Sequence, residues 1–402
     1  MQTGNRLSHQ RAPDPCITLI PGRCHDAMPQ FSLETLEQLA HEAGFAAAGM
    51  AAVPVPDSPE DREERSRFDA WVDEGRAGEM DYLKRRDNAG ALVRSSLRVA
   101  LPWARSVIVC AANYNSAHPR STDPANPDAG WIARYAWSGR AEPESRPSDY
   151  HKVLLRRLKA LRDQLTGRFD PFESRCFVDT GPVVERVYAR YAGIGWTGKN
   201  TCILNQRLGS WLFLGVIVTS LEVARESPVA QLAPDRCGSC TRCIDACPTG
   251  ALTGPRQMDA SLCISYLTIE KRGPIPEDLR PLVGRQIFGC DICQDVCPWN
   301  QRAPVAADPE LSPRAGLVNP ALETLANLDE PEWERQFNGS PVRRAQFSGF
   351  RRNLAIAMGN SGQHKFLPIL REWAASPDPA LSESASWAVR RLEQQPLEQH
   401  TT

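Results

Sequence analysis

The sequence lacks any apolar run long enough to cross a membrane. No stretch of about eighteen consecutive apolar residues occurs, so no transmembrane helix is predicted. Charges of the two signs nearly cancel, giving a formal net charge of −1. No global field therefore draws the molecule to nucleic acid or membrane, and a nucleic-acid surface must be a local patch. Residues 1–30 also lack a charged-then-apolar leader and a twin-arginine pair, which predicts a cytoplasmic protein.

The composition is otherwise that of an ordinary globular protein. Of the 402 residues, 42% are hydrophobic and 24% are charged, which predicts a soluble fold of two or three domains. Cysteine is abundant, with thirteen copies. In a reducing compartment most of these cysteines are not expected to form disulfides. Metal or redox chemistry is the expected use.

Hydrophobic patterns predict an α/β domain over residues 31–230, after a polar and aperiodic stretch at 1–30 that is expected to be a flexible extension. Within 31–230, helical and strand-like patterns alternate along the chain, which indicates this fold class. The helical patterns lie at 31–43, 150–165 and 183–192, and the strand-like patterns lie at 104–112, 174–179 and 210–220.

Two further domains are predicted from a change of character after residue 230. Residues 231–310 are dense in cysteine and show little periodicity, so we expect a ferredoxin-like domain held by ligand bonds rather than by a buried core. Residues 311–402 show helical patterns at 350–358 and 380–392, separated by Gly, Asn and Pro turns. This pattern predicts an all-α domain of HEAT-like helical hairpins.

Eight cysteines follow the spacing of a two-cluster bacterial ferredoxin. A complete Cys-x2-Cys-x2-Cys-x3-Cys-Pro run starts at Cys237, and a run one cysteine shorter starts at Cys290. Cys263, between them, supplies the missing ligand. Because the fourth cysteine of such a run ligates the other cluster, two [4Fe–4S] clusters are predicted. Cluster 1 takes Cys237, Cys240, Cys243 and Cys297, and cluster 2 takes Cys247, Cys263, Cys290 and Cys293.

The alternative use of these cysteines is a pair of structural zinc sites. Zinc knuckles usually pair two Cys-x2-Cys units across a longer spacer, and the triple repeat followed by Cys-Pro differs from that pattern. The remaining cysteines are expected to be free thiols that pack as small hydrophobic side chains. They are Cys16, Cys24, Cys110, Cys176 and Cys202.

The chain resembles the epoxyqueuosine reductase (QueG) family over roughly residues 31–395. The motifs that carry the resemblance are RYAW (134–137), DYH (149–151), VDTGPVVERVYARYAGIGWTGKNTCIL (178–204), GSWLFLG (209–215), CGSCTRCIDACPTGAL (237–252), CISYLTIEKRGPIP (263–276), GCDICQDVCPWN (289–300) and FRRNLAIAMGNSG (350–362). The chain departs from the family by an insertion at 138–148, rich in Pro, Glu and Arg, which we expect to be a surface loop.

This resemblance implies a cobalamin-dependent oxidoreductase with two [4Fe–4S] clusters and an α/β core similar to that of reductive dehalogenases. Family members reduce epoxyqueuosine at the wobble position of tRNA, the last step of queuosine biosynthesis. The implied partners are a tRNA carrying epoxyqueuosine and an unidentified low-potential electron donor. Because no coiled coil or symmetric interface is evident, we expect a monomer.

By the same resemblance, Asp179 in the VDTGP motif is the proton donor to the departing oxygen. It follows an apolar strand, which predicts a partly buried carboxyl group suited to acid chemistry. From the residues alone, a helix cap is the more common role for an aspartate at a strand end.

The resemblance also implies a set of cobalamin contacts. The Gly-rich turn at 193–200 suits close approach of the backbone to a flat cofactor, although a plain turn explains it equally well. The arginine assigned to this set is Arg94, and the alternatives to it are Arg85, Arg86 and Arg98. The implied contacts are Arg94, Lys199, Asn200, Ile203, Leu214, Asp259 and Ser261.

Basic residues outnumber acidic ones between Arg335 and Glu393, which favours phosphate contacts over a merely solvated helix face once the resemblance is considered. The arginines concerned are Arg343, Arg344, Arg351, Arg352, Arg390 and Arg391. Trp196, Tyr266 and Trp299 are candidates to stack on an unpaired base, against the default of core packing.

Two other functions compete with tRNA modification. The first is a corrinoid reductive dehalogenase acting on small organohalides, which the missing twin-arginine signal and the basic helical tail disfavour. The second is an iron–sulfur electron carrier or RNA-binding scaffold, which the long α/β region disfavours because a carrier rarely needs one. Cobalamin content would separate the second from the enzymes.

Overall fold

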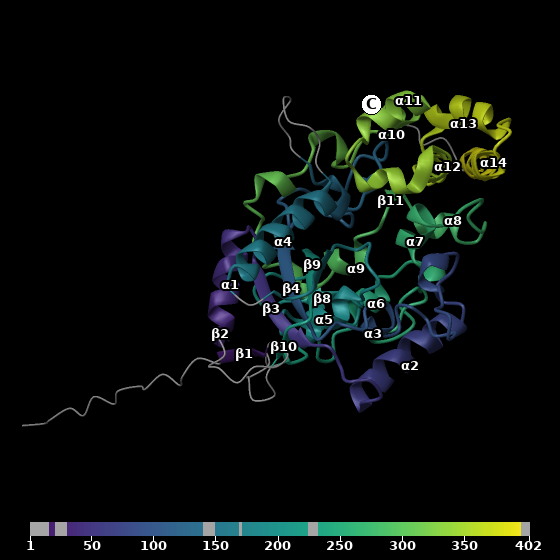
Figure 1. The fold of residues 1–402 in the computed structure, drawn as a ribbon. Helices are drawn as coiled ribbons and strands as arrows, with labels where there is room; N and C mark the ends of the chain where they lie inside the picture. Colours follow the sequence, from purple (N-terminus) through teal and green to yellow (C-terminus); the bar gives the residue numbers. More distant parts are fainter. Residues whose placement is uncertain (1–15, 21–29, 140–148, 169–170, 224–231, 395–402) are drawn as a thin grey trace, which may run out of the picture.

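The computed structural model describes residues 16–20, 30–139, 149–168, 171–223 and 232–394. Its centre is a four-stranded sheet of order β3-β4-β9-β6 (Figure 1). All three pairings are antiparallel, although strands and helices alternate along the chain. The strands are β3 (Ala47–Ala52), β4 (Ser106–Asn113), β9 (Leu212–Thr219) and β6 (Ser174–Phe177).

Helices cover both faces of this sheet. Successive side chains of a strand point to opposite faces, so Ile108 and Cys110 of β4 lie in one apolar cluster and Val107 and Val109 in another. The first cluster is closed by α1 (Leu33–Glu42) and α4 (Tyr150–Thr166), and the second by α3 (Leu97–Ala100) and α5 (Glu185–Tyr191). The expected α/β region is therefore a sheet between two helical layers.

The six patterns used for this region all correspond to observed elements, with ends shifted by at most two residues. The helix expected from residue 31 begins at Leu33, because Gln30–Ser32 form β2. Cys16–Ile20 form β1, which pairs with β2 and with β10 (Glu222–Val223). The stretch expected to be a flexible extension, residues 1–30, thus includes one described strand at residues 16–20.

Two small strand pairs and an unpredicted helix complete this half of the molecule. The helix α2 (Pro59–Asp73) starts at the N-cap Ser58, whose side chain accepts a hydrogen bond from the Asp61 amide. The strand pairs are the parallel β5 (Trp131–Ile132) with β11 (Gln286–Phe288), and the antiparallel β7 (Trp196–Thr197) with β8 (Ile203–Leu204).

The C-terminal region is helical, as expected, and lies at one end of the molecule (Figure 1). The helix α14 packs against α12 and α13. The assignment of these helices to HEAT-like repeats stays a prediction. The helices are α10 (Leu322–Ala326), α11 (Glu330–Gln336), α12 (Gln346–Gly359), α13 (Leu367–Ala374) and α14 (Pro379–Glu393).

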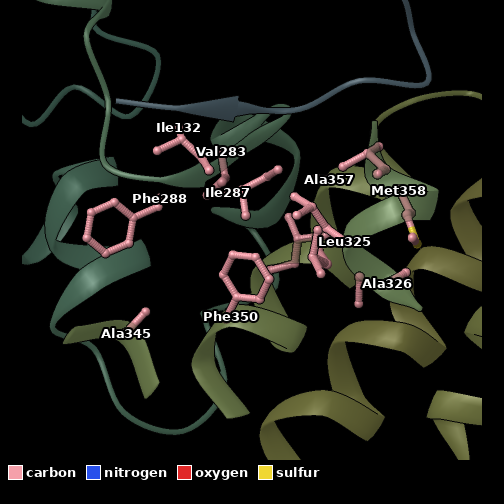
Figure 2. Close-up of a cluster of buried hydrophobic side chains, with 14 of the residues drawn as sticks. Ile132, Val283, Ile287, Phe288, Leu325, Ala326, Ala345, Phe350, Ala357 and Met358 are labelled. Atoms are coloured by element: carbon pink, nitrogen blue, oxygen red, sulfur yellow. The ribbon is translucent and has the colours of Figure 1, made fainter. Parts of the chain in front are cut away.

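The helical tail shares one hydrophobic core with much of the cysteine region. Figure 2 shows Ile287 and Phe288 of β11 packed beside Phe350 of α12. The expectation that the cysteine region buries little core is therefore wrong after about residue 260. The short helices of this region are α6 (Arg242–Asp245), α7 (Ile264–Ile269), α8 (Arg280–Val283) and α9 (Ile292–Asp295).

The Arg352 side chain is buried in this shared core, where it bonds to backbone oxygens and is out of reach of a phosphate group. The side chain is 1% exposed, and its guanidinium donates to the carbonyl oxygens of Leu267, Lys271 and Gly273 at 2.6–2.8 Å. Including it among the phosphate-binding arginines was wrong, because composition does not reveal burial. Arg390, from the same expected set, is exposed and pairs with Glu277 at 3.1 Å.

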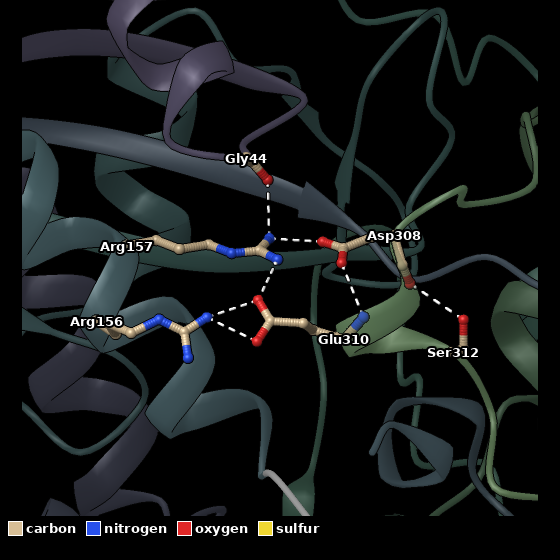
Figure 3. A network of polar contacts seen from close by, with 6 residues as sticks. All are labelled: Gly44, Arg156, Arg157, Asp308, Glu310 and Ser312. Atoms are coloured by element: carbon tan, nitrogen blue, oxygen red, sulfur yellow. Dashed lines mark hydrogen bonds and ion pairs between the residues drawn. The ribbon is translucent and has the colours of Figure 1, made fainter. Parts of the chain in front are cut away.

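A polar network attaches the segment after the second cysteine run to α4 (Figure 3). The Arg157 guanidinium donates to Asp308 at 2.6 Å, to Glu310 at 2.9 Å and to the Gly44 carbonyl at 2.9 Å. Arg156 also donates to Glu310, at 2.6 Å. Partial burial opposes ionisation, but the hydrogen bonds from both arginines lower the pKa of Glu310 to about 2.

Two further expectations concern the described part of the chain. Its helices include none that is both long and apolar enough to span a membrane. The 138–148 insertion lies outside the described residues except for Ser138 and Gly139. Ser138 is buried and forms an antiparallel bridge with Pro313.

Candidate active site

Asp179 lies just beyond β6, in a left-handed backbone conformation with φ of 54°. Few residues other than glycine adopt this conformation, which is concentrated at functional turns, and aspartate tolerates it better than most. The side chain is 51% exposed. The carboxyl group is therefore less buried than its place after an apolar strand predicted, and it faces open space in this conformation.

The DYH motif holds Asp179. Asp149 is the N-cap of α4, and its Oδ1 accepts hydrogen bonds from the His151 amide at 2.9 Å and from His151 Nδ1 at 2.6 Å. The Tyr150 hydroxyl donates to Asp179 Oδ2, and His151 Nε2 lies 3.7 Å from the same oxygen. The helix cap thus places two proton-carrying side chains beside Asp179, a role that residue spacing alone could not assign.

Packing fixes Tyr150. Its ring stacks on Phe213 of β9 with centroids 4.1 Å apart and planes 7° apart, and on the His151 ring at 4.0 Å. Tyr135 meets it edge-on at 6.2 Å. Burial, followed by the negative charge of Asp179, raises the pKa of Tyr150 well above its ordinary value. Tyr150 therefore remains a hydrogen-bond donor to Asp179 at any physiological pH.

His151 is biased toward its charged form. Burial lowers its pKa, but the hydrogen bond to Asp149 and the charges of Asp149 and Asp179 outweigh burial, and the net pKa is raised. A histidine between two carboxylates can hold a proton at neutral pH and return it to Asp179 after that group has released one. The cluster is thus arranged to deliver protons at one carboxyl oxygen.

A cavity of about 1040 Å³ lies close to this cluster. Its walls come from α2, from the segment around Arg94, from the start of α5 and from both ends of the first cysteine segment. Trp71, Leu97 and Val187 contribute apolar surface. Pro182 and Val184, which lead from Asp179 into α5, also line it. The cavity and Asp179 are therefore linked by a few residues of one turn.

Charged side chains crowd the wall between the cavity and Asp179. Burial, followed by the charge of Asp179, raises the pKa of Glu185 to about 7, with Arg94 and Arg186 opposing the shift. Glu185 Oε1 is buried and makes no hydrogen bond within the described structure. Arg94 and Arg186 themselves line the cavity.

This cavity suits the corrinoid that the resemblance implied. A corrinoid presents a broad apolar ring with amide side chains at its rim, and the cavity combines apolar walls with charged side chains such as Arg94 and Arg186. Its volume is at the upper limit of about 300–1,000 Å³ for small-ligand pockets, as a large cofactor requires. Glu185 is not itself a lining residue, but its orphaned oxygen belongs to the residue between the lining residues Val184 and Arg186.

Among the competing arginines, Arg94 lines the cavity. Arg98 instead donates to the backbone oxygens of Val53 and Pro54, and Arg86 donates to the Gly90 carbonyl and pairs with Asp73. The structure thus favours Arg94 on position. Its contact with a cofactor stays a prediction.

Lys199 and Asn200 contact the cysteine region, between the cavity-lining residues Thr197 and Thr201. Lys199 Nζ donates to the Gly238 carbonyl at 2.7 Å. Asn200 is buried, donates to the Cys293 carbonyl at 3.2 Å and accepts from the Cys202 amide at 3.2 Å. Both side chains therefore hold the loop against the cysteines, whether or not they also meet a cofactor.

Four other expected contacts occupy structural positions. Ile203 is buried in the sheet core, and Leu214 packs against the same cluster. Asp259 caps a short 3₁₀ helix by accepting from both the amide and the hydroxyl of Ser261, at 2.9 and 2.6 Å. The preceding residue, Met258, lines the cavity. Their proposed cofactor contacts are not tested by this geometry.

The glycine-rich turn at 193–200 packs on its own hairpin. A side chain at Gly195 would place a Cβ 2.2 Å from the Leu204 carbonyl oxygen, and one at Gly198 would lie 2.7 Å from Asn200 and Leu204. These glycines are therefore required by the close fold of β7 on β8. The plain-turn interpretation explains them without a cofactor.

The eight motif thiols fall into two groups of neighbours. In the first, Cys297 lies near Cys237 and Cys243, which add to the effect of burial in raising its pKa, and Cys243 lies near Cys237 and Cys240 in the same way. In the second, Cys247, Cys263 and Cys290 lie near one another, and Cys263 and Cys290 act on Cys293. Across the described residues, no three His, Cys, Asp or Glu side chains gather tightly enough to hold a single metal ion.

Trp196 joins the cavity to the first group of thiols. It lines the cavity, its Nε1 donates to Cys237 Sγ at 3.5 Å, and Trp299 packs edge-on against it at 5.1 Å. Tyr266 is buried, and its hydroxyl accepts from the Glu79 amide at 2.9 Å. Trp196 and Tyr266 are therefore fixed by packing, and naming them as base-stacking groups was wrong.

The cysteines outside the motif differ from one another. Cys110 is buried in the sheet core as expected, and Cys176 is half-buried beside the same cluster. Cys202 is a free thiol, as expected, and lies beside Cys293, a predicted ligand of cluster 2. Cys24 lies outside the described residues, and of Cys16 only the backbone strand is described.

Two family models match the chain. Residues 94–180 match "Epoxyqueuosine reductase QueG, DUF1730", and residues 236–300 match "4Fe-4S double cluster binding domain". The second match covers all eight motif cysteines and sets the zinc interpretation aside. The first ends one residue after Asp179 and includes the DYH motif.

Similar proteins span nearly the whole chain. An epoxyqueuosine reductase of Synechocystis sp. is 42% identical over 306 residues, covering 76% of this chain and 98% of that protein. A crystal structure of an epoxyqueuosine reductase with an epoxyqueuosine-modified tRNA-Tyr stem loop is 29% identical, with a TM-score of 0.75 and coverage of 89% of both chains.

A third similar structure bears on the aspartate loop. It is an epoxyqueuosine reductase from Bacillus subtilis, 28% identical, with a TM-score of 0.74 and coverage of 89% of this chain and 90% of that chain. That structure is described as having its catalytic aspartate loop swung out of the active site. On the identity and coverage of these relatives, together with the two family models, this chain belongs to the epoxyqueuosine reductase (QueG) family.

Proposed function

We propose that this protein reduces epoxyqueuosine in tRNA to queuosine, with electrons passing through two [4Fe–4S] clusters to cobalamin. The observation that carries the proposal is the position of Asp179. It is held by Tyr150 and His151 beside a cavity whose wall also touches the cysteine region. Family membership indicates the reaction, and the position of Asp179 beside the cavity supports the roles proposed for the aspartate and the cavity.

The reaction defines what the residues must do. Removing the epoxide oxygen breaks two C–O bonds, forms a C=C bond and releases water, which consumes two electrons and two protons. Bound cobalamin supplies the low-potential reductive chemistry at carbon. The protein must exclude water, position the epoxide and deliver protons to the departing oxygen.

Asp179 is the proposed donor of the first proton. Its carboxyl group reaches open space beyond β6, and Tyr150 steadies the oxygen that is not engaged with substrate. His151, with its raised pKa, is the proposed source from which Asp179 is reprotonated. Asp149 holds the His151 ring in the orientation that this transfer needs.

The cavity is the proposed cofactor site. Arg94 and Arg186 place positive charge on its wall, and Glu185 offers an unpaired acceptor nearby. The remaining contacts proposed for the cofactor are those implied by family resemblance: Lys199, Asn200, Ile203, Leu214, Asp259 and Ser261.

The grouping of the thiols supports the proposed ligand sets. Cys297, from the second run, lies with the first-run thiols Cys237 and Cys243, and Cys247, from the first run, lies with Cys263 and Cys290. This exchange of the fourth cysteine follows the two-cluster ferredoxin rule. The clusters would therefore share ligands between runs, close to Trp196 and the cavity wall.

Several attributes accompany this proposal. A cytoplasmic monomer, an unidentified low-potential donor and the boundaries 1–30, 31–230, 231–310 and 311–402 are retained as expectations. The reductive-dehalogenase likeness of the 31–230 core is also retained. The continuous apolar core across residue 310 indicates that the last two units fold together.

Anaerobic turnover tests the function. Reconstituted protein, cobalamin, a strong reductant and tRNA carrying epoxyqueuosine are incubated, and the nucleosides are read by mass spectrometry. Conversion to queuosine supports the proposal. Absence of conversion by protein with full iron and cobalamin content overturns it, and parallel incubation with small organohalides then tests the dehalogenase-like alternative.

A further inference from the structure

Several large hydrophobic side chains are exposed in the described structure. Among them Tyr82 is the aromatic one, and it is 44% exposed. It lies in the 3₁₀ turn η1 (Asp81–Leu83). Two guanidinium groups flank its ring, that of Arg94 at 5.5 Å and that of Arg344 at 5.3 Å from the centroid. An aromatic ring and two guanidinium groups together present the stacking and cationic groups that bind bases and phosphates, which makes this surface a candidate binding site.

The two arginines come from opposite halves of the chain. Arg94 lines the cavity next to Asp179. Arg344 belongs to η7 (Pro341–Ala345) of the helical tail, where Glu270 pairs with it and Arg272 donates to its carbonyl at 3.0 Å. Tyr82 therefore sits where the cavity wall and the helical tail meet.

This surface borders the catalytic groups. The charge of Arg344 acts on His151, and that of Arg94 acts on Glu185, each of which also responds to Asp179. Glu270, the partner of Arg344, acts on Tyr135, which contacts Tyr150. A nucleotide whose neighbour is presented to Asp179 would thus fall within reach of Tyr82.

We propose that Tyr82, Arg94 and Arg344 form a stacking and phosphate-binding site for the RNA nucleotide adjacent to the modified one. This inference rests on the proposed function. Single-stranded RNA is held by bases stacked on aromatic rings or guanidinium planes, and by cations on the backbone phosphates. The exposed ring supplies the stacking surface, and Arg344, with half of its side chain exposed, supplies the phosphate contact.

The proposal replaces the stacking groups expected from sequence. Trp196 and Tyr266 are bonded and buried, whereas Tyr82 is partly exposed, with its hydroxyl donating to Met80 Sδ at 3.3 Å. Arg352 is sealed inside the core, whereas Arg344 reaches the surface beside it. Of the six tail arginines expected to contact phosphate, Arg352 is excluded by burial, and Arg344 is the one that contacts Tyr82.

Binding of a labelled anticodon stem-loop RNA to the reconstituted enzyme tests the site without turnover. Fluorescence anisotropy should show Kd about ten-fold higher for Tyr82→Ala and within about two-fold of wild type for Tyr82→Phe, since stacking needs the ring and not the hydroxyl. Arg344→Ala should lower the slope of log Kd against log salt by about one.

Arg371→Ala is the matched control. Arg371 is also an exposed tail arginine paired with a glutamate, Glu393 at 2.8 Å, but it lies on α13 at the far end of the tail. Its variant should bind RNA with the wild-type Kd and salt slope. An equal loss in Arg371→Ala and Arg344→Ala would overturn the assignment of a specific site.

A photocrosslink provides a readout that does not depend on the stability of a variant. Stem-loop RNA with 5-iodouridine next to the modified position should crosslink to wild-type Tyr82, identified by peptide mass spectrometry. If the wild-type enzyme converts epoxyqueuosine and Tyr82→Ala keeps the wild-type Kd and KM, the inference is refuted and the proposed function stands. Wild-type enzyme that binds RNA but never converts it would refute the function alone.

Discussion

The two cysteine runs share a ligand pattern but occupy opposite surroundings. From Leu232 to Pro248, every side chain is exposed or half-buried. The second run follows the buried strand β11, and Asp291, Asp295 and Cys297 within it are themselves buried. The first run is held by a few contacts at its edge, such as Lys199 with Gly238, whereas the second belongs to the core.

This difference assigns separate roles to the runs. Cys290 and Cys263 pack against the apolar cluster that also contains α12 and α14, so the second run is an integral part of the fold. The first run depends on its cluster for order, because it buries almost no apolar surface of its own. Its exposure also suits electron entry from an external donor. If each cluster takes one cysteine from the other run, as proposed, the exposed run is anchored to the buried one.

The largest expected effect comes from removing one cysteine ligand from each of the two runs in turn. Cys290→Ser should lose cluster 2 and lower the thermal stability sharply, because a polar group replaces a thiol packed on the core. Cys240→Ser should lose cluster 1 with a small change in melting temperature. Iron analysis and circular dichroism melting measure both effects, and equal melting temperatures for the two variants would contradict the comparison.

A second pair of substitutions removes hydrogen bonds that hold the two cysteine runs and leaves the cysteines unchanged. Asn200→Ala removes a buried amide that bridges Cys293 and Cys202, and should cost about 1–3 kcal/mol because two backbone groups lose their partner. Lys199→Ala removes one exposed hydrogen bond to Gly238 and should cost less than about 1 kcal/mol. Thermal melting of the reconstituted proteins compares them, and a larger loss for Lys199→Ala would reverse the assignment.

The smallest effect concerns the chain that leaves the second run. The pKa of Glu310 falls from an ordinary 4.5 to about 2 on folding, so its stabilisation is present above pH 4.5 and is lost as the pH falls toward 2. Wild-type melting temperature should therefore decrease across this range more steeply than that of Glu310→Gln. Parallel curves for the two proteins would show that the network in Figure 3 contributes nothing.

The sequence was most informative where the chemistry is local. Cysteine spacing predicted the two ligand groups, because the ligands of one run are close in the chain. Apolar patterns likewise predicted the strands and helices around the sheet. Asp179 was found through its motif, but the grouping of Tyr150, His151 and Asp179 depends on two elements meeting in space, which spacing does not encode.

Burial was the property that sequence could not supply. Arg352 and Tyr266 looked like surface groups suited to RNA, and both proved to be bonded within the core. Tyr82 showed no periodic signal, yet it is exposed between two arginines. Whether an arginine or aromatic side chain faces solvent is decided by the packing of distant segments, here the helical tail on α7 and β11.

The most direct test of the account is turnover by Asp179→Asn, an isosteric change that removes the proton. The account predicts a loss of roughly 10²- to 10⁴-fold in queuosine formation, with wild-type iron content, cobalamin content and RNA affinity. Asp163→Asn, which changes an exposed aspartate on α4, should leave turnover unchanged. Wild-type rates of queuosine formation by Asp179→Asn would contradict the central claim that this carboxyl group delivers the proton to the departing epoxide oxygen.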